Sequence, residues 1–315
     1  MTRRGREDRP APAATRRGRT GLGMLVLGLG LGLAGAAAAG RLARSRKHAD
    51  IHDASLRRTR DGAAILGASV LMDSAMEHFR GGYENRVMYL GPTMAAASVA
   101  ASLSEPRLHP GGSAARVAHG ACLVTGIVGT GFHLWNITRR PGGLSWNNLF
   151  YAAPIGAPGA LSIAGLLGLA TEAMAVRQED RRTTGRALAA LSGLSLLGES
   201  AEVALLHFRG AFHNPAMYLP ITVPPLAGIV LVALAVRPHA GGQRVTRLLL
   251  RIVGGLGVLG TAFHVYGVSR NMGGWSNWRQ NALAGPPTPA PISFTGLGLA
   301  GLAALDLLDN ARDRA

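Results

Sequence analysis

Four histidines recur in matching pairs and could ligate a metal. His78 opens the stretch HFRGGYENRVMYL, and His207 opens the closely similar HFRGAFHNPAMYL. His133 ends GTGFH, and His264 ends GTAFH. Imidazole is a common ligand of haem iron, copper and zinc. The pattern therefore predicts one haem b, copper, iron or zinc site in each half of the chain. The alternatives are that these histidines bond loop carbonyls and close helix ends, or that they contact a substrate directly.

Acidic residues precede both HFRG stretches at one spacing. Asp73 and Glu202 each lie five residues before the histidine and seven before Arg80 or Arg209. Seven residues of helix return to within about 20° of the same face, so each acid shares a face with its arginine while the histidine points elsewhere. Such a carboxylate either forms a structural ion pair or serves a proton or ion pathway. The candidates for this acidic site are Asp73, Glu77, Arg80, Glu199, Glu202 and Arg209.

Four further polar residues are candidates for orienting the histidines. Thr130 and Thr261 precede His133 and His264 by three residues, which places hydroxyl and imidazole on one helix face. Each hydroxyl could fix the ring of its histidine or bond a carbonyl of its own helix. Asn85 and Asn214 keep their place in both HFRG stretches and belong to the same candidate set.

The elements that carry these residues are apolar blocks of membrane-spanning length. Hydrophobic residues make up 48% of the 315-residue chain, and charged residues only 16%, against about 25% in soluble domains. Blocks of about 18–22 apolar residues match the helix length that a bilayer core requires. The sequence therefore predicts an all-α integral membrane protein. Its helices are expected at 62–79, 88–104, 115–138, 157–177, 187–208, 217–236, 246–269 and 290–309.

The order of the motifs predicts two tandem repeats of four transmembrane helices, at 62–177 and 187–309. An even number of helices gives both repeats the same orientation, so they are parallel rather than inverted. Residues 1–20 are expected to be a disordered basic N-terminus. The apolar segment 21–40 is either a ninth transmembrane helix, acting as a signal anchor, or a cleaved signal peptide. Residues 41–61 form a basic cytoplasmic linker.

Most arginines and lysines of the loops fall on the side opposite the repeated motifs. The positive-inside rule then predicts a cytoplasmic (inner) membrane protein with a cytoplasmic C-terminus and outward-facing motif loops. The net charge of +16 reflects these helix-flanking arginines, and no nucleic-acid partner is expected. The single cysteine, Cys122, excludes an internal disulfide. The expected partners are the lipid bilayer and a periplasmic redox protein.

Four functions fit these observations to different degrees. The leading one is a membrane protein whose outward-facing histidines bind haem b or a metal ion for electron transfer. The first alternative is a small-molecule or ion transporter that uses Asp73 and Glu202 within the membrane. A membrane-embedded enzyme ranks lower, because no nucleophile or metalloprotease motif is present. A scaffold without chemistry explains the apolar helices but leaves the repeated polar motifs without a reason.

Overall fold

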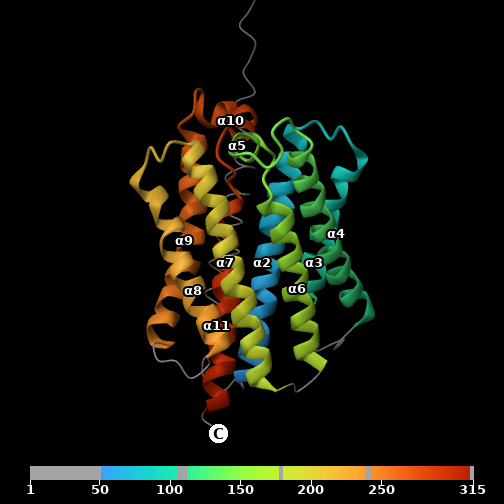
Figure 1. Cartoon of the computed structure of the whole chain (residues 1–315), viewed down its shortest axis with the longest axis vertical. Coiled ribbons are helices and arrows are strands. Elements are labelled where there is room, and N and C mark those ends of the chain that lie inside the picture. Colours follow the sequence, from blue (N-terminus) through green and yellow to red (C-terminus); the bar gives the residue numbers. More distant parts are fainter. Residues whose placement is uncertain (1–50, 105–111, 177–179, 238–242, 313–315) are drawn as a thin grey trace, which may run out of the picture.

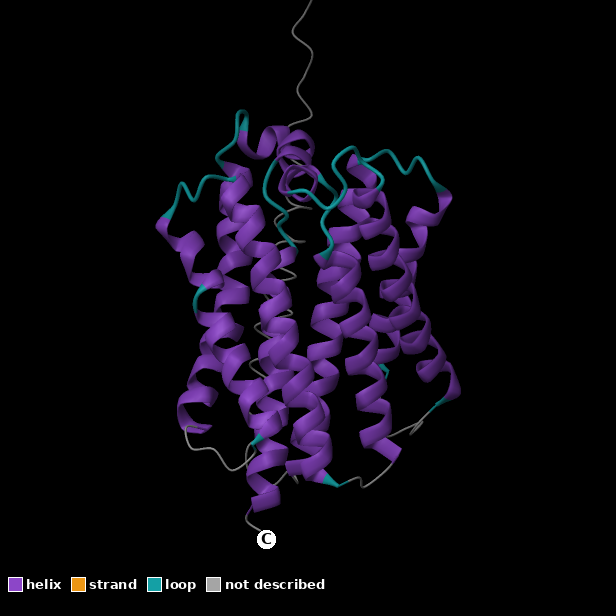
Figure 2. Ribbon diagram, in the orientation of Figure 1, coloured by secondary structure: helices purple, strands orange, loops and turns teal. Residues whose placement is uncertain are grey.

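The computed structural model describes residues 51–104, 112–176, 180–237 and 243–312. The segments expected at 1–20 and 21–40, and the start of the linker expected at 41–61, lie outside these ranges. Across the described residues the chain is helical and contains no strand (Figure 2). The prediction of an all-helical protein is confirmed for this part of the chain.

Eight long helices form two closed groups of four. In the first half of the chain these are α2 (Ile51–Arg80), α3 (Leu90–Leu103), α4 (Ser113–Thr138) and α6 (Gly156–Val176). In the second half they are α7 (Arg181–Arg209), α8 (Val223–Val236), α9 (Gln243–Ser269) and α11 (Ser293–Arg312). Around each group every helix packs against two neighbours, in the rings α2–α3–α4–α6 and α7–α8–α9–α11.

The two halves meet chiefly where α2 packs along α11 (Figure 1). Gly62 and Gly296 allow the two helices to approach closely. A Cβ added at Gly62 would lie 2.7 Å from the carbonyl oxygen of Gly296, and one added at Gly296 would lie 2.8 Å from that of Gly62. The contact between α6 and α7 is much smaller. In Figure 1, α3 and α4 flank the centre on one side, and α8 and α9 flank it on the other.

Six of the described helical segments are long and apolar enough to cross a membrane. They are Ser113–Thr138, Gly156–Val176, Arg181–Arg209, Pro215–Val236, Gln243–Ser269 and Ala290–Asp309. The sequence predicted eight spans in the same region, and α2 and α3 do not meet this standard. Because α2 is covered by α3, α6 and α11, it can carry polar residues that a lipid-facing helix could not.

Helices α4 and α9 turn large apolar side chains outward. Val128, Phe132 and Trp135 on α4 are exposed, and so are Leu259 and Phe263 on α9. An exposed apolar surface of this extent is typical of a membrane protein, since lipid tails cover it. The chain is therefore best described as a multi-pass membrane protein.

Two helices begin earlier than the sequence suggested. Helix α2 starts at Ile51 rather than at residue 62, so the second part of the expected linker is helical. Helix α7 starts at Arg181 rather than at 187, because Asp180 caps its first turn. The Asp180 carboxylate accepts hydrogen bonds from Thr183 Oγ1 at 2.8 Å and from Arg182 N at 3.0 Å. These bonds hold the pKa of Asp180 below its ordinary value.

Short helices that the sequence analysis did not predict lie at one end of the bundle. Helix α5 (Trp146–Tyr151) precedes α6, and α10 (Trp278–Ala284) precedes the last helix. We call this the short-helix end (Figure 1). Short 3₁₀-helices also occur at η1 (Arg86–Tyr89), η2 (Pro215–Ile221), η3 (Gly274–Asn277) and η4 (Ala290–Ile292).

Pro224 and Pro225 occupy the start of α8, where η2 ends and proline needs no hydrogen-bond partner. In the first half, η1 ends at Tyr89 and α3 follows directly, with Pro92 in its first turn. Both halves therefore enter this helix through a 3₁₀ turn, and neither contains a mid-helix proline break there.

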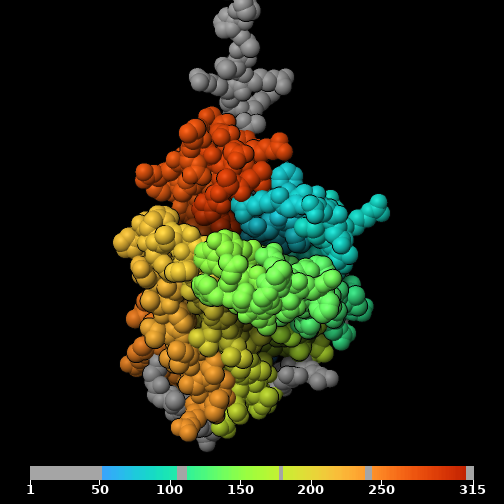
Figure 3. Space-filling view, turned by 45° about the horizontal axis from the view of Figure 1, so that its top comes forward, coloured from blue at the N-terminus to red at the C-terminus, as the bar shows by residue number. Residues whose placement is uncertain are grey.

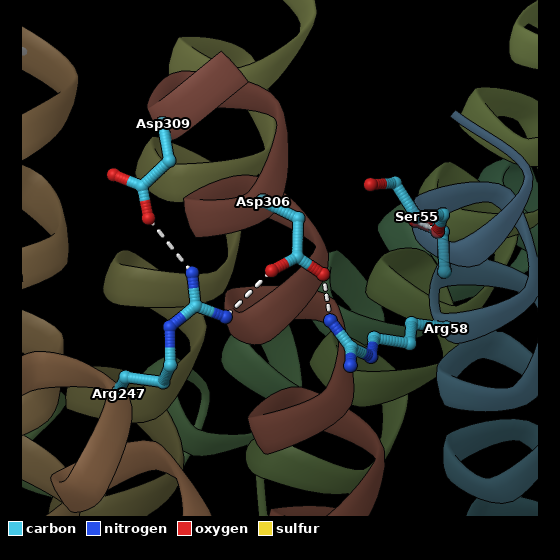
Figure 4. Close-up of polar contacts among 6 residues, drawn as sticks. Ser55, Arg58, Arg247, Asp306 and Asp309 are labelled. Carbon is cyan, nitrogen blue, oxygen red and sulfur yellow. Dashed lines mark hydrogen bonds and ion pairs between the residues drawn. The ribbon is translucent and has the colours of Figure 1, made fainter. Parts of the chain in front are cut away.

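At the opposite end of the bundle, a network of charges joins both halves. Asp306 on α11 lies between Arg58 on α2 and Arg247 on α9 (Figure 4). Arg247 also reaches Asp309 at 2.8 Å through its second terminal nitrogen. All four side chains are one-third exposed or less, so these pairs are shielded in part from water. We call this group the α11 ion network.

Candidate functional site

The histidines predicted to act together lie in two pairs at the short-helix end, one pair in each half. His78 ends α2 and lies within electrostatic range of His133, which is near the end of α4. His207 ends α7 and lies within range of His264 near the end of α9. The structure thus brings together the histidines of the same half.

Backbone carbonyls engage the Nδ1 atom of these rings. His133 donates to the Pro154 carbonyl at 2.8 Å, and His264 donates to the Pro287 carbonyl at 2.7 Å. His207 donates to the Met217 carbonyl at 2.8 Å. The Nδ1 of His78 is buried without a hydrogen-bond partner, and the backbone of Met88, the counterpart of Met217, interacts with this side chain.

These bonds decide which nitrogen of each ring could bind a ligand. A carbonyl only accepts, so a bonded Nδ1 carries the proton and leaves the lone pair of a neutral ring on Nε2. Among the described residues, no hydrogen bond engages Nε2 of any of these four rings. A carbonyl partner of this kind fixes the orientation of metal-binding histidines in proteins generally.

The turn that follows each HFRG stretch closes the helix in the same way twice. The Tyr83 N–H donates to the His78 carbonyl at 3.0 Å, and the Phe212 N–H donates to the His207 carbonyl at 3.1 Å. Both aromatic residues have positive φ, 48° and 46°, which is uncommon for bulky side chains. Tyr83 stacks on Tyr89 with ring centroids 4.1 Å apart. The similarity of the two stretches therefore has a structural cause, independent of any ligand.

Asn85 and Asn214 take part in this turn rather than orienting a histidine. The Asn85 side-chain oxygen accepts from Val87 N, and that of Asn214 accepts from Ala216 N, both at 2.9 Å. Each asparagine thereby caps the 3₁₀ turn that leads into the next long helix.

The threonines also serve their own helices. Thr130 Oγ1 donates to the Gly126 carbonyl at 2.9 Å, and Thr261 Oγ1 donates to the Gly257 carbonyl at 3.0 Å. This is the second of the two roles that the sequence left open. The orienting partners of His133 and His264 are instead the carbonyls of Pro154 and Pro287, which the sequence analysis did not identify.

The acidic candidates gather where α2 faces α7. Asp73 interacts electrostatically with Glu202, and Glu199 interacts with both. Ser293 on α11 donates its hydroxyl to Glu199. The Glu202 carboxylate packs against Gly156 at the start of α6, where a helix N-terminus favours negative charge. The structure thus brings the three carboxylates together between the two halves.

The two candidate arginines reach across from one half to the other. Arg209 donates to the Leu149 carbonyl at 2.9 Å and to the Ala152 carbonyl at 3.4 Å, at the end of α5. Arg80 pairs with Glu77 and donates to the carbonyls of Ala282 and Gly285 at 3.1 Å, at the end of α10. Each arginine therefore holds the short helix of the other half; we call these contacts the arginine crossover.

In the space-filling view, the segments that the crossover joins lie side by side at this end of the molecule (Figure 3). The green segment that contains α5 lies beside the gold start of the η2 region (Figure 3). The orange-red segment that contains α10 lies beside the cyan segment that follows α2 (Figure 3). Helix C-termini present free carbonyls, so a buried guanidinium is well placed to satisfy them.

Two buried asparagines that the sequence analysis missed hold the loops before these short helices. The Asn148 side-chain amide donates to the carbonyls of Pro141 and Gly143 at 3.0 and 2.8 Å. The Asn281 amide donates to the carbonyls of Met272 and Gly274 at 3.2 and 2.8 Å. The sequence signal was the asparagine that follows each Gly-Gly pair, close to the tryptophans.

The set of metal ligands at these sites is small. Across residues 51–104, 112–176, 180–237 and 243–312, no group of three or more His, Cys, Asp or Glu side chains is arranged to hold a metal ion. Each histidine pair would therefore supply two protein ligands. A zinc ion usually takes three or four protein ligands, whereas a haem supplies four nitrogens of its own and needs only axial ones.

Comparisons with known proteins give no further guide to this site. No protein-family model, no curated protein and no solved structure matches the chain. The assignment of function therefore rests on the geometry of the residues described above.

Replacing Arg209 by Met is expected to loosen α5 while leaving α10 unchanged. The substitution removes two hydrogen bonds from a charged donor, and each such bond contributes about 1.5–3 kcal/mol. Hydrogen exchange of the amides of α5 should then become at least about tenfold faster. Arg80→Met should show the reverse pattern, with faster exchange in α10. The exposed Arg86→Met variant is the control, and equal changes in both short helices would contradict the crossover.

Proposed function

We propose that the chain is a duplicated membrane protein with one ligand-binding histidine pair in each half, His78 with His133 and His207 with His264. The preferred ligand is haem b, and the function is electron transfer at one membrane face. The proposal is supported by His133, His207 and His264. In each of these rings Nδ1 is bonded to a backbone carbonyl, and Nε2 has no hydrogen-bond partner among the described residues.

Haem suits the residues present better than an isolated copper, iron or zinc ion. The two imidazoles of a pair would suffice as the protein ligands of a haem iron, whereas a bare ion would require ligands beyond the pair. When bound, the haem would supply one-electron chemistry. The protein would hold it through Nε2 of the paired histidines and tune it through the carbonyls on Nδ1. The exposed aromatic side chains around this end would contact the edge of such a ligand.

The duplication is supported by contacts that recur between matching residues of the two halves. The histidine–carbonyl bonds, the asparagine caps and the arginine crossover each occur twice. The arginine distribution of the sequence favours an orientation in which the short-helix end faces outward from the cytoplasmic membrane. A periplasmic redox protein is then the natural partner, and the C-terminus is cytoplasmic.

A transporter is the second candidate, and one observation favours it. Asp73, Glu199 and Glu202 converge between α2 and α7, beside the weakly packed boundary of α6 and α7. Carboxylates within a membrane protein commonly mark ion or proton pathways. The third candidate, a scaffold without chemistry, is supported by the structural roles of the HFRG turns.

The deciding experiment is an absorption spectrum of the protein purified in mild detergent, oxidised and reduced, with elemental analysis of the same sample. Cells supplied with a haem precursor, iron, copper and zinc should yield two haems per chain. His133→Ala and His264→Ala should each retain one haem, and the double variant should retain none. His213→Ala is the matched control, because this exposed ring bonds only the nearby Gly210 carbonyl.

Two other outcomes would change the assignment. Bound copper, iron or zinc that the same histidine variants remove would replace haem by a metal-ion site. A colourless and metal-free protein would overturn the proposal and leave Asp73→Asn and Glu202→Gln as the variants to test for transport.

A further inference from the structure

A seam of polar residues crosses the interior of the first half, far from the histidine pairs. His119 on α4 is 1% exposed, and its Nδ1 lies 2.9 Å from the hydroxyl of Ser98 on α3. Glu172 on α6 is 3% exposed, and its Oε2 is buried without a hydrogen-bond partner. The hydroxyl of Ser102, on α3, is also buried without a partner. Buried polar groups nearly always have a hydrogen-bond partner. We therefore expect a bound ligand at these two atoms, or a proton on the Glu172 carboxylate.

Helix geometry directs Glu172 and His119 toward each other. The His119 ring packs on the backbone of Gly168, where any Cβ would overlap it. Glu172 follows Gly168 by one turn, on the same face of α6. Side chains of a helix lean toward its N-terminus, so the Glu172 carboxyl leans toward Gly168 and the ring above it. Because α4 runs antiparallel to α6, the His119 ring leans in the opposite sense, toward the level of Glu172.

The second half fills the matching positions with leucine. Leu250 and Leu231 meet over Gly301, with side-chain carbons 2.8 and 3.0 Å from where its Cβ would lie. One turn farther along α11 is Leu305, which is fully buried. When the repeated motifs of the two halves are aligned, Leu250 corresponds to His119, Leu231 to Ser102 and Leu305 to Glu172. An apolar seam of the same shape is therefore compatible with this fold, and packing alone does not require the polar residues.

We propose that Ser102, His119 and Glu172 form a proton-binding site in which the Glu172 carboxyl and the His119 Nε2 share one exchangeable proton through a bound water. Such a water would have three partners, the usual number for a buried water. Uptake of the proton forms an O–H bond on the Glu172 carboxylate or an N–H bond on Nε2 of His119. Release breaks that bond and transfers the proton to the same water. Ser98 holds the other ring nitrogen in place.

The charged and titratable groups around the seam are few. On α4, Arg116 interacts electrostatically with Glu172 from an exposed position, and Cys122 lies beside Ser98. Helix α2 packs against α6, and its first turns carry His52, which contacts the Met174 carbonyl, together with Asp53, Arg57 and Arg58, of which Arg58 pairs with Asp306 on α11. Helix α3 contributes no titratable side chain. Arg116 also marks the end of the bundle from which a proton would enter.

The test uses the full-length protein in detergent and observes the two groups directly. Infrared difference spectra between acidic and alkaline samples should show a carboxyl C=O band that is lost in Glu172→Gln. The exposed Glu84→Gln is the control and should keep the band. In ¹⁵N-histidine NMR spectra, the titration midpoint of His119 should shift by at least about one pH unit in Glu172→Gln, since the two groups share a proton.

A seam variant provides a folded reference. Ser102→Leu, His119→Leu and Glu172→Leu together reproduce the residues of the second half and should fold, with both signals lost. The haem or metal content of this variant should be unchanged. A failure of the proton-site proposal can therefore be distinguished from a failure of the proposed function. An identical infrared spectrum in Glu172→Gln, together with an unshifted His119 signal, would overturn the proposal. The more conservative Ser102→Ala should keep the band but move its frequency.

Discussion

Replacing Asp306 by Ala is expected to lower the stability of the protein by about 3 kcal/mol. The substitution leaves Arg58 and Arg247 without their shared carboxylate, and removing one partner from a shielded ion pair costs about 3–5 kcal/mol. The lower end of that range applies because both arginines are partly exposed. For a chain of this size the melting temperature should fall by roughly 6–12 °C, measured by thermal unfolding in detergent.

Asp309→Ala is the matched control for this prediction. Asp309 makes one contact with Arg247, and its side chain is 33% exposed. Its loss should cost about 1 kcal/mol or less, as for surface ion pairs. Equal effects of the two variants would mean that Asp306 does not link α2, α9 and α11 as Figure 4 indicates.

Gly126→Ala and Gly257→Ala are expected to have the second largest effect, about 2–3 kcal/mol each. A Cβ at Gly257 would lie 2.7 Å from the Thr295 backbone nitrogen, and one at Gly126 would overlap the backbone of Ser162. Because backbone cannot rotate away as a side chain can, α4 must separate from α6, and α9 from α11. Thermal unfolding of each variant measures the cost.

Gly131 supplies the control within α4. A Cβ at Gly131 meets no atom within 4 Å, so Gly131→Ala should stabilise the helix by up to about 1 kcal/mol through its higher helix propensity. If Gly126→Ala were as well tolerated as Gly131→Ala, the close packing of α4 on α6 would be wrong.

Much of the helical framework could be predicted from the sequence, because apolar blocks of fixed length and repeated motifs are strong signals. The early start of α2 could not be predicted. The polar residues in its first turns are tolerated because α3, α6 and α11 pack against α2. Hydropathy is calculated along the sequence and contains no information about such packing. Helices α5 and α10 were missed because six or seven residues in a Trp- and Asn-rich loop carry little periodicity.

The candidate sites were predictable to different extents. Histidines of the same half lie within electrostatic range of each other, an arrangement that the sequence did not distinguish from pairs between the halves. Asp73 and Arg80 interact, as the helical spacing indicated. The carbonyl partners of the rings could not be predicted, since backbone atoms leave no mark in the sequence. The repeated motifs do not indicate His119, because the second half has leucine, Leu250, at the matching position. This difference between the halves is itself the sequence signal for the buried histidine.

The arginine crossover has a consequence for ancestry and assembly. Arg209 of the second half bonds backbone carbonyls of α5 in the first half, and Arg80 of the first half bonds those of α10 in the second. Each half therefore depends on an arginine of the other half to bond these carbonyls. A polypeptide containing a single half would obtain the missing guanidinium only from another copy of itself. Under the duplication proposed above, the four-helix ancestor would have been a twofold symmetric homodimer. Fusion of its two subunits into one gene would then have allowed the two copies to differ in sequence.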